Sequence, residues 1–564
     1  MTPRPPNSET IDPAISWRAR GLGFATGAMG VLGLAPFHLW PATVAMFAVL
    51  FVRLRGVARA REGFSVGLWT GLGYFSCGMF WIAQAFFERG AEYVPLIVPL
   101  VLGLFVLLSL FWGAAGALFA GMRSSGGVRA GWDAVALAAL IWLAEFARGH
   151  LFGGFPWNLP GYAWEAGTAM SQLASVVGVW GLSALVILSG TFSGLAVVEW
   201  RRAQGGRSLA AGTVALGIVA GSFAFGAARL AQAPSVALTE APSVADARPL
   251  LRLVHVPFRQ NEMMDENRAV LMTNRYFRET LRTPLDTPRG RVTHIVWPEG
   301  AVRGEAVDDL GFLSVFARTL EGETLAGETL AGETLAGETD PPHFLFTSQR
   351  STLGPNADGV PEWTYFNSAV AVSYEGGAPA VAGWTDKYRL VPFGEVVPFP
   401  ADAVLELFGL GALAASFTPA DGKGVSTLPD LPPASVQICY EVVFPALTRP
   451  APGDPDARWI LNQSNDAWFG SLSGPAQHAA TARMRALEDG LPLVRAAANG
   501  WSGTVDAWGR WVARMGPDAT GHLDVALPAA TASTIYQRWM DAILVLIMLS
   551  GILCAFVAGR NSTA

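Results

Sequence analysis

Lysine, cysteine and histidine are all scarce in this chain of 564 residues. The 39 basic residues include only two lysines, Lys387 and Lys423, and there are three cysteines and seven histidines. So few cysteines exclude a disulfide framework or a cysteine-rich metal site, and the histidines lack the spacing that is typical of metal ligands. We therefore expect no metal and no cofactor.

Charge is scarce as well, since 15% of the residues are charged whereas 51% are hydrophobic. The net charge of -6 comes without any basic cluster, which argues against a nucleic-acid partner. A chain of this length and composition is too long for one ordinary domain and too apolar for a wholly soluble protein. Composition thus predicts a membrane part joined to a more polar part.

Apolar runs occur at residues 21–39, 41–52, 64–87, 94–121, 131–147, 170–198, 210–228 and 538–558. Most are near or above the roughly 20 residues that a helix needs to cross a bilayer. They predict a multi-pass α-helical membrane domain of about eight helices. Two alternatives are that the first run is a signal peptide and that the short second run is re-entrant.

The distribution of arginine argues against both alternatives. With eight crossings and an inside N-terminus, thirteen arginines fall in inside segments and three lie in or beside the short outside segments. The inside set is Arg4, Arg18, Arg20, Arg53, Arg55, Arg59, Arg61, Arg123, Arg129, Arg201, Arg202, Arg207 and Arg560, and the outside set is Arg89, Arg148 and Arg229. Because positive charge accumulates on the cytoplasmic side, residues from about 232 to 536 are predicted to lie outside the cytoplasm.

The chain is thus predicted to have three parts: a membrane domain at 1–231 with seven helices, an extracytoplasmic domain at 232–536, and an eighth membrane helix at 537–564. In the middle part, β-rich runs alternate with loops and with helical stretches near 264–283 and 475–489, which favours an α/β domain. The β-rich runs are 251–256, 292–297, 343–347, 366–372, 435–439 and 459–462.

Two stretches of the middle part differ from the rest in composition. The unit Gly-Glu-Thr-Leu-Ala repeats in tandem within 321–340, and we expect a mobile surface insertion without catalytic residues. The stretch 399–417 is unusually apolar for an extracytoplasmic loop. It is interpreted either as a core helix or as a lid that dips into the membrane and admits an acyl chain.

Four motifs in the middle part carry reactive side chains, and three of them lie at or just after an apolar strand. Glu299 follows the run that ends at Trp297, Cys439 follows Val436-Gln437-Ile438, and Lys387 and Glu395 share one motif. The fourth motif spans 465–470 and contains Trp468. Strand ends are where α/β folds usually place catalytic groups.

A nucleophilic cysteine needs assistance, because a thiol with an ordinary pKa of about 8.5 is only a few per cent thiolate near neutrality. A glutamate could accept its proton, and a lysine could stabilise the thiolate and then an oxyanion. Glu299, Lys387 and Cys439 would supply these parts for acyl transfer through a thioester. A plainer interpretation is a core cysteine beside a Lys–Glu ion pair at the surface.

Together these motifs resemble the nitrilase, or carbon-nitrogen hydrolase, superfamily, in which Glu, Lys and Cys occur in this order. The residues that carry the resemblance are Trp297-Pro298-Glu299, the run from Lys387 to Glu395, Cys439-Tyr440-Glu441 and the run 465–470. The helical frame and the motifs at 145–149, 154–157, 475–478 and 482–486 resemble one membrane branch, the apolipoprotein N-acyltransferases. The resemblance covers almost the whole chain and implies an αββα sandwich for the middle part.

The resemblance implies an N-acyltransferase of a bacterial inner membrane, with its catalytic domain on the periplasmic face. Such an enzyme would move an acyl chain from a phospholipid to the N-terminal amine of a diacylglyceryl-cysteine on an apolipoprotein. The expected phospholipid is phosphatidylethanolamine. The reaction would be ping-pong, with Glu299 as base, Lys387 as oxyanion partner and Cys439 as nucleophile. The resemblance implies supporting or substrate-binding roles for Glu395, Tyr440, Glu441 and Trp468, and no metal.

Some features depart from the family pattern or point elsewhere. The stretch 255–261 lacks a Gln-Gly-Asn-like turn, Gly300-Ala301 follows Glu299, and the repeat is foreign to the family. A Gly-x-Ser-x-Gly pattern at 63–67 fits a serine nucleophile but opens a membrane helix, so we interpret it as chance. Glu145 could be an intramembrane functional acid or a partner of Arg148.

Two other functions stay open from the residues alone. One is a membrane-tethered nitrilase-type amidase, in which water rather than an amine resolves the thioester. The other is a transporter or structural membrane protein with a degenerate soluble domain, in which Cys439 has no part in acyl transfer.

Overall fold

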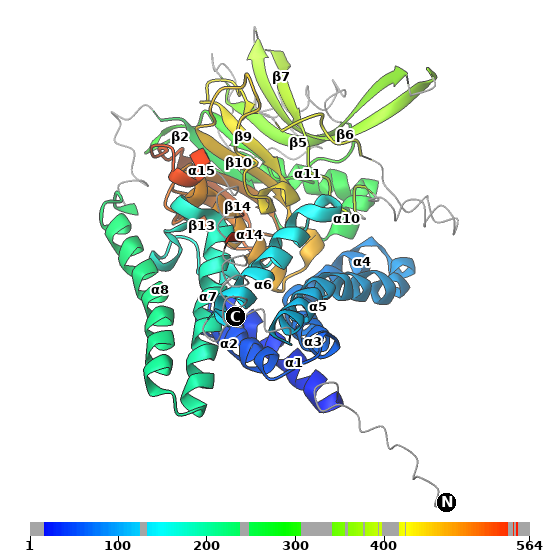
Figure 1. Ribbon diagram of the computed structural model, residues 1–564. Coiled ribbons are helices and arrows are strands. Elements are labelled where there is room, and N and C mark those ends of the chain that lie inside the picture. Colours follow the sequence, from blue (N-terminus) through cyan, green and yellow to red (C-terminus); the bar gives the residue numbers. More distant parts are fainter. Residues whose placement is uncertain are drawn as a thin grey trace, which may run out of the picture.

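The computed structural model describes residues 16–124, 132–236, 248–305, 341–355, 359–375, 378–392, 394–396, 417–423, 425–539, 545 and 549–550. The repeat at 321–340, the stretch 399–417 apart from Phe417, and nearly all of the expected eighth membrane helix lie outside these residues. In the described part, long helices form one end of the molecule and two sheets form the other (Figure 1).

Seven helices follow the first seven apolar runs. They are α1 (Trp17–Gly30), α2 (Trp40–Arg55), α3 (Ala60–Met79), α5 (Gly103–Ser124), α6 (Asp133–His150), α7 (Ala174–Arg201) and α8 (Gly205–Ala231). Within the described residues, five helical stretches are long and apolar enough to cross a membrane: Ala60–Arg89, Ala91–Ser124, Asp133–Gly153, Ala174–Arg201 and Gly205–Ala231. The helices α1 and α2 are shorter, with 14 and 16 residues. The first ends inside its apolar run because a 3-10 turn at Val31–Gly33 and a turn around Pro36 follow it.

Glycine allows the helices to approach closely. A Cβ atom at Gly63 would lie 2.3 Å from the carbonyl oxygen of Gly116, and one at Gly67 would lie 2.1 Å from that of Trp112. Both pairs join α3 to α5, in the manner of small residues at membrane-helix interfaces. The Gly-x-Ser-x-Gly pattern at 63–67 therefore serves helix packing.

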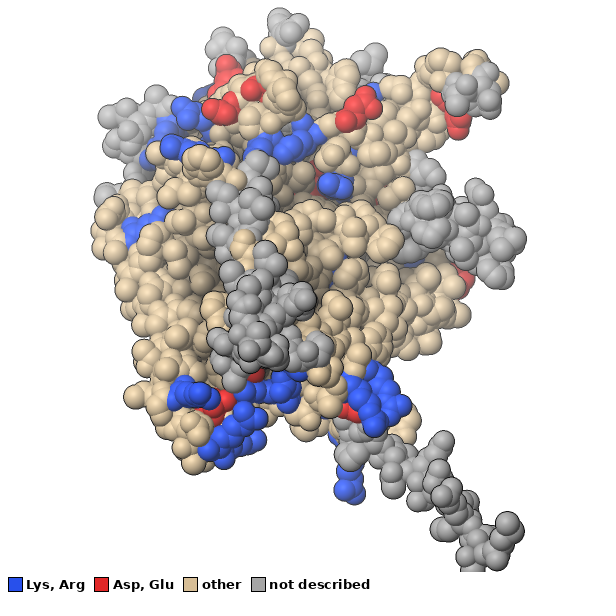
Figure 2. Space-filling model, viewed as in Figure 1, with Lys and Arg blue, Asp and Glu red and all other residues tan. Residues whose placement is uncertain are grey.

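Arginine and acidic residues tie the helices together at the end that lies away from the sheets. Arg55 of α2 lies 2.8 Å from Asp133 of α6 and 2.9 Å from Glu199 of α7, and all three side chains are buried. Figure 2 shows Lys and Arg gathered at this lower end of the view. The basic ends of α2, α5 and α7 thus lie on the same side of the helical domain.

Two six-stranded sheets form the second part. In spatial order the first contains β14 (Gly521–Ala526), β1 (Leu250–His255), β4 (His294–Val296), β5 (His343–Pro355), β6 (Pro361–Glu375) and β7 (Ala378–Asp386). The second contains β13 (Trp511–Met515), β12 (Ser502–Val505), β11 (Leu493–Ala498), β10 (Trp459–Asn465), β9 (Ala434–Ile438) and β8 (Val425–Ser426). The central neighbours β1-β4-β5 and β9-β10-β11 are parallel, and each of the six predicted β-rich runs falls on a strand.

The two sheets pack face to face around apolar side chains such as Leu253, Val296 and Ile438. The outer face of the first sheet packs against α11 (Glu266–Thr280). The outer face of the second packs against α14 (Ser473–Asp489), which also contacts α7 of the membrane domain. The predicted αββα sandwich is confirmed, and α14 lies between its second sheet and the membrane helices.

Candidate active site

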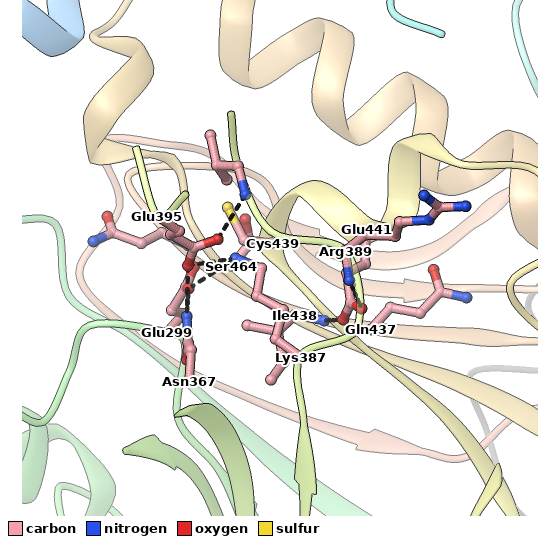
Figure 3. A network of polar contacts seen from close by, with 12 residues as sticks. Glu299, Asn367, Lys387, Arg389, Glu395, Gln437, Ile438, Cys439, Glu441 and Ser464 are labelled. Carbon is pink, nitrogen blue, oxygen red and sulfur yellow. Dashed lines mark hydrogen bonds and ion pairs between the residues drawn. The ribbon is translucent and has the colours of Figure 1, made fainter. Parts of the chain in front are cut away.

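Three of the predicted residues come from the ends of strands in the two facing sheets. Glu299 lies just after β4, Lys387 follows β7 and Cys439 follows β9. Figure 3 shows these side chains in one cluster together with Glu395. The structure therefore brings together residues that are far apart in the chain.

Lys387 lies between two carboxylates. Its Nζ is 2.8 Å from Glu395 Oε1 and 3.7 Å from Glu299 Oε1, and its side chain is 1% exposed. The amide of Asn367 donates to both carboxylates, at 2.8 Å to Glu299 and 2.9 Å to Glu395. The interpretation of a surface ion pair is therefore wrong, because the lysine is buried.

Electrostatics keep this lysine charged. Burial alone would lower the pKa of Lys387, but the carboxylates of Glu395 and then Glu299 outweigh it and raise the pKa above its ordinary value. A fixed ammonium inside a site with little water stabilises a developing negative charge more strongly than an ammonium in solvent does. Lys387 can therefore act as an oxyanion partner without a change of protonation.

Cys439 is held as a neutral thiol in the resting site. Burial raises the pKa of its thiol first, and the charge of Glu299 raises it further, against the opposing effects of Lys387 and of a hydrogen bond with Ser464. Its backbone is left-handed, with φ +50°, which costs a side-chain-bearing residue roughly 1–2 kcal/mol. The thiol is thus protonated beside a carboxylate that can accept its proton.

Glu441 connects the loop that follows Lys387 to the end of β9, which precedes Cys439. Its Oε1 accepts hydrogen bonds from the backbone N–H groups of Tyr388 and Arg389, at 2.8 and 3.0 Å, and its Oε2 accepts from Ile438 at 2.7 Å. Burial raises the pKa of Glu441 to about 7, against these hydrogen bonds. These contacts are consistent with the supporting role predicted for Glu441, which holds the backbone on both sides of the site.

The raised pKa of Glu441 predicts a pH-dependent stability. Because the folded state binds this proton more tightly than the unfolded chain does, stability falls as the pH rises from about 4.5 through about 7. The contribution is about 3 kcal/mol. Thermal unfolding of the Glu441→Gln variant between pH 5 and 8 should show a weaker loss of stability than the parent protein. An identical pH dependence in both proteins would contradict this assignment.

Tyr440 and Trp468 are the remaining two of the predicted supporting residues. The Tyr440 hydroxyl donates to the carbonyl of Gly154 at 3.3 Å, and its ring stacks on Phe155. Both contacts come from the segment between α6 and α7. Trp468 lies half-buried on a short turn after β10, where the neighbouring Phe469 packs against Trp81 and Trp157 of the membrane domain.

Three polar residues of the site were not singled out from the sequence. Asn367 bridges the carboxylates of Glu299 and Glu395. A hydrogen bond with Ser464 lowers the pKa of the Cys439 thiol. The backbone N–H of Asn465 donates to Glu299 Oε2 at 3.0 Å. Asn465 lies inside a recognised motif, whereas Asn367 is a lone polar residue within β6.

In the membrane part, the predicted pairing of Glu145 with Arg148 is confirmed, since the two side chains lie 2.6 Å apart.

Metal ligation finds no support in the described part of the chain, where no three or more His, Cys, Asp or Glu side chains are grouped as a metal would need. The cluster of Glu299, Lys387 and Cys439 offers a carboxylate, an ammonium and a thiol. An apolar helical domain joined to a sandwich with this buried site defines a membrane-bound enzyme of the carbon-nitrogen hydrolase class.

Comparison with known sequences agrees with this class and narrows it. The apolipoprotein N-acyltransferase N-terminal domain matches residues 26–192, and the carbon-nitrogen hydrolase domain matches residues 279–537. The apolipoprotein N-acyltransferase of Caulobacter vibrioides is 34% identical, over 96% of this chain and 95% of its own length. Those of Rhodopseudomonas palustris and Bradyrhizobium diazoefficiens are 31% and 32% identical, each over 93% of this chain and 92% of their own length.

The chain belongs to the apolipoprotein N-acyltransferase family, and it is an acyltransferase built on a carbon-nitrogen hydrolase fold. Its apolar helices and its relatives make it a bacterial membrane protein.

Proposed function

We propose that this enzyme transfers an acyl chain from a membrane phospholipid, through a thioester on Cys439, to the N-terminal amine of a diacylglyceryl-cysteine on an apolipoprotein. The observation that carries the proposal is the cluster of Glu299, Glu395 and the buried Lys387 together with the Cys439 thiol (Figure 3). Phosphatidylethanolamine is the donor that we propose, in keeping with the resemblance described above.

In the first half-reaction, Glu299 takes the proton from Cys439 as the sulfur attacks the ester carbonyl of the phospholipid. Lys387 donates a hydrogen bond to the oxyanion of the tetrahedral intermediate. The intermediate collapses, the C–O bond breaks, and the leaving lysophospholipid oxygen recovers the proton from Glu299. The product is an acyl thioester on Cys439.

In the second half-reaction, the amine of the apolipoprotein attacks the thioester carbonyl while Glu299 accepts a proton from it. The C–S bond breaks, and the cysteine sulfur recovers its proton from Glu299. The two half-reactions together form a ping-pong cycle. No oxidant, metal or cofactor is consumed in either one.

We assign the remaining site residues by their contacts. Glu395 holds Lys387 in place and accepts the backbone N–H of Val391 at 2.8 Å. Tyr440 and Glu441 orient the nucleophile from its C-terminal side. Trp468, which is half-buried on the turn after β10, is proposed to line the approach of the substrate.

We further propose three parts for the chain: a membrane domain at 1–231, a catalytic domain at 232–536 and a last membrane helix at 537–564. The gathering of arginine at the helix ends away from the sheets supports an orientation with that end in the cytoplasm. The catalytic domain would then lie on the periplasmic face of the inner membrane. Both substrates carry their acyl chains in that membrane.

Intact-mass analysis of the purified protein mixed with phosphatidylethanolamine vesicles tests the proposal. The parent protein should gain the mass of one acyl chain, and the Cys439→Ser variant should not form this thioester adduct. Cys77→Ser, which changes a half-buried thiol of α3, is the matched control and should behave as the parent does. Absence of an adduct on the parent protein would overturn the thioester.

A second stage of the same experiment separates transfer from hydrolysis. Addition of a diacylated lipopeptide with a free N-terminal amine should remove the adduct and yield an N-acylated peptide. Release of free fatty acid, with the peptide unchanged, would instead identify the amidase-type hydrolase.

A further inference from the structure

His478 lies completely buried behind the nucleophile and has no part in the reaction steps above. It belongs to α14 and its Nε2 is 3.1 Å from the backbone carbonyl oxygen of Cys439. Because a carbonyl oxygen can only accept, Nε2 carries a proton and donates it. The imidazole therefore holds the peptide group that follows the nucleophile.

This hydrogen bond lies at a strained point of the backbone. Cys439 is one of the few non-glycine residues with a left-handed conformation, at φ +50°. Strained backbone persists only where the surrounding structure holds it. The carbonyl that His478 binds belongs to this same residue, so its position is coupled to the direction of the thiol.

The ring of His478 is itself fixed from the other side. Its Nδ1 lies 2.8 Å from Asp466 Oδ1, and Asp466 Oδ2 lies 2.7 Å from Arg495 Nη2. All three side chains are fully buried. Arg495 and His478 hold the pKa of Asp466 down at about 2, against the effect of burial. Nδ1 therefore faces both this carboxylate and the guanidinium of Arg495, whose Nη2 lies 3.2 Å away.

The membrane domain holds the same region of α14. The ring of Trp157 stacks on His478 with centroids 5.4 Å apart. The adjacent Gln477 accepts hydrogen bonds from the indoles of Trp81 and Trp157, at 3.1 and 2.9 Å, and donates to the carbonyl of Gly78 at 3.0 Å. The imidazole thus lies between the catalytic domain and the membrane domain.

We propose that His478 is a positioning residue for acyl transfer: it holds the Cys439 carbonyl, and with it the backbone that directs the thiol. Asp466 orients the ring, and Trp157 holds it from the membrane side. The inference rests on the proposed function, because it presumes that Cys439 is the nucleophile. It assigns the membrane domain a part in the geometry of the nucleophile.

Two substitutions at His478 separate this role from a structural one. In His478→Gln the amide nitrogen takes the place of Nε2 and can still donate to the Cys439 carbonyl. In His478→Asn the shorter side chain places its amide near Nδ1, where it keeps the contact with Asp466 and loses the carbonyl. Both variants are made in the full chain, and unfolding temperatures are measured for each.

The readout is the first-order rate of thioester formation at saturating phosphatidylethanolamine, with the half-saturating lipid concentration measured alongside. We expect His478→Gln to stay within about tenfold of the parent and His478→Asn to fall about 100-fold, since a small misplacement of a reacting group has an effect of that order. The half-saturating concentration should change little. Equal rates in the two variants, or a faster Asn variant, would overturn the proposal.

Two further measurements keep the result decisive. If His478→Asn does not fold, Trp157→Leu replaces it, with an expected loss of about tenfold in the same rate; no loss would overturn the proposal. If the parent forms no thioester, the proposed function fails. The positioning role of His478 is then tested on its own, by the rate at which iodoacetamide alkylates Cys439. His478→Asn should then change the alkylation rate and His478→Gln should not, and any other pattern overturns the positioning role.

Discussion

Replacing Lys387 with methionine should lower the rate of thioester formation by at least about 1,000-fold. The loss of one donor to the oxyanion has an effect of about 100- to 1,000-fold. The substitution also leaves the carboxylates of Glu299 and Glu395 without the cation that lies between them, so their mutual repulsion adds to the loss. The rate is measured by intact mass after mixing with phosphatidylethanolamine vesicles.

Stability needs its own control, because breaking a buried ion pair costs about 3–5 kcal/mol. The double variant Lys387→Met with Glu395→Gln removes the excess negative charge and should recover most of the unfolding temperature without recovering activity. Lys423→Met changes the other lysine of the chain, which donates to the carbonyl of Ala446 rather than to a carboxylate of the cluster, and it should leave the rate within about twofold. Recovery of activity in the double variant would show that Lys387 serves only to balance charge.

Lysine at this position is informative because the chain uses arginine almost everywhere else. A compact ammonium fits between two carboxylates and beside a developing oxyanion, whereas a forked guanidinium is broader and points its donors in fixed directions. The scarcity of lysine was thus a useful signal in the sequence. It distinguished Lys387 from Lys423 only together with the surrounding motif.

The sequence predicted the helices and strands well where the signal is local. Length and hydropathy are properties of a continuous segment, so the membrane helices and the buried strands could be recognised, and α11 and α14 fall close to their expected ranges. The short length of α1 could not be seen from hydropathy, because the apolar run continues past Gly30 through a turn. Hydropathy reports the environment of a segment rather than its backbone conformation.

Contacts between distant segments were harder to predict. Asn367 lies in the interior of β6, and nothing in its neighbours marks it as the bridge between Glu299 and Glu395. The buried state of the Lys387 ion pair depends on how the two sheets pack, and a spacing between residues does not contain that information. The same holds for His478, whose bond to Cys439 depends on the place of α14 between the sandwich and the membrane helices.

Replacing Glu299 with glutamine should lower the rate of thioester formation by about 100- to 10,000-fold, as expected for the loss of a general base. The electrostatic effect on the thiol has the opposite sign. The charge of Glu299 raises the pKa of Cys439, so its removal should lower that pKa and make the thiol more reactive toward a small alkylating reagent. A base and a merely electrostatic neighbour are therefore distinguished by two rates that move in opposite directions.

Both rates can be measured on one protein in which Cys77 and Cys554 are replaced by serine, so that Cys439 is the only thiol. Alkylation by iodoacetamide is followed as a function of pH, and acylation is followed by intact mass. Glu305→Gln, an exposed glutamate in the same loop, is the matched control and should change neither rate. If Glu299→Gln keeps acylation within about tenfold of the parent, the proton of Cys439 must leave by another route, and Glu395, the other carboxylate of the cluster, is then the residue to test.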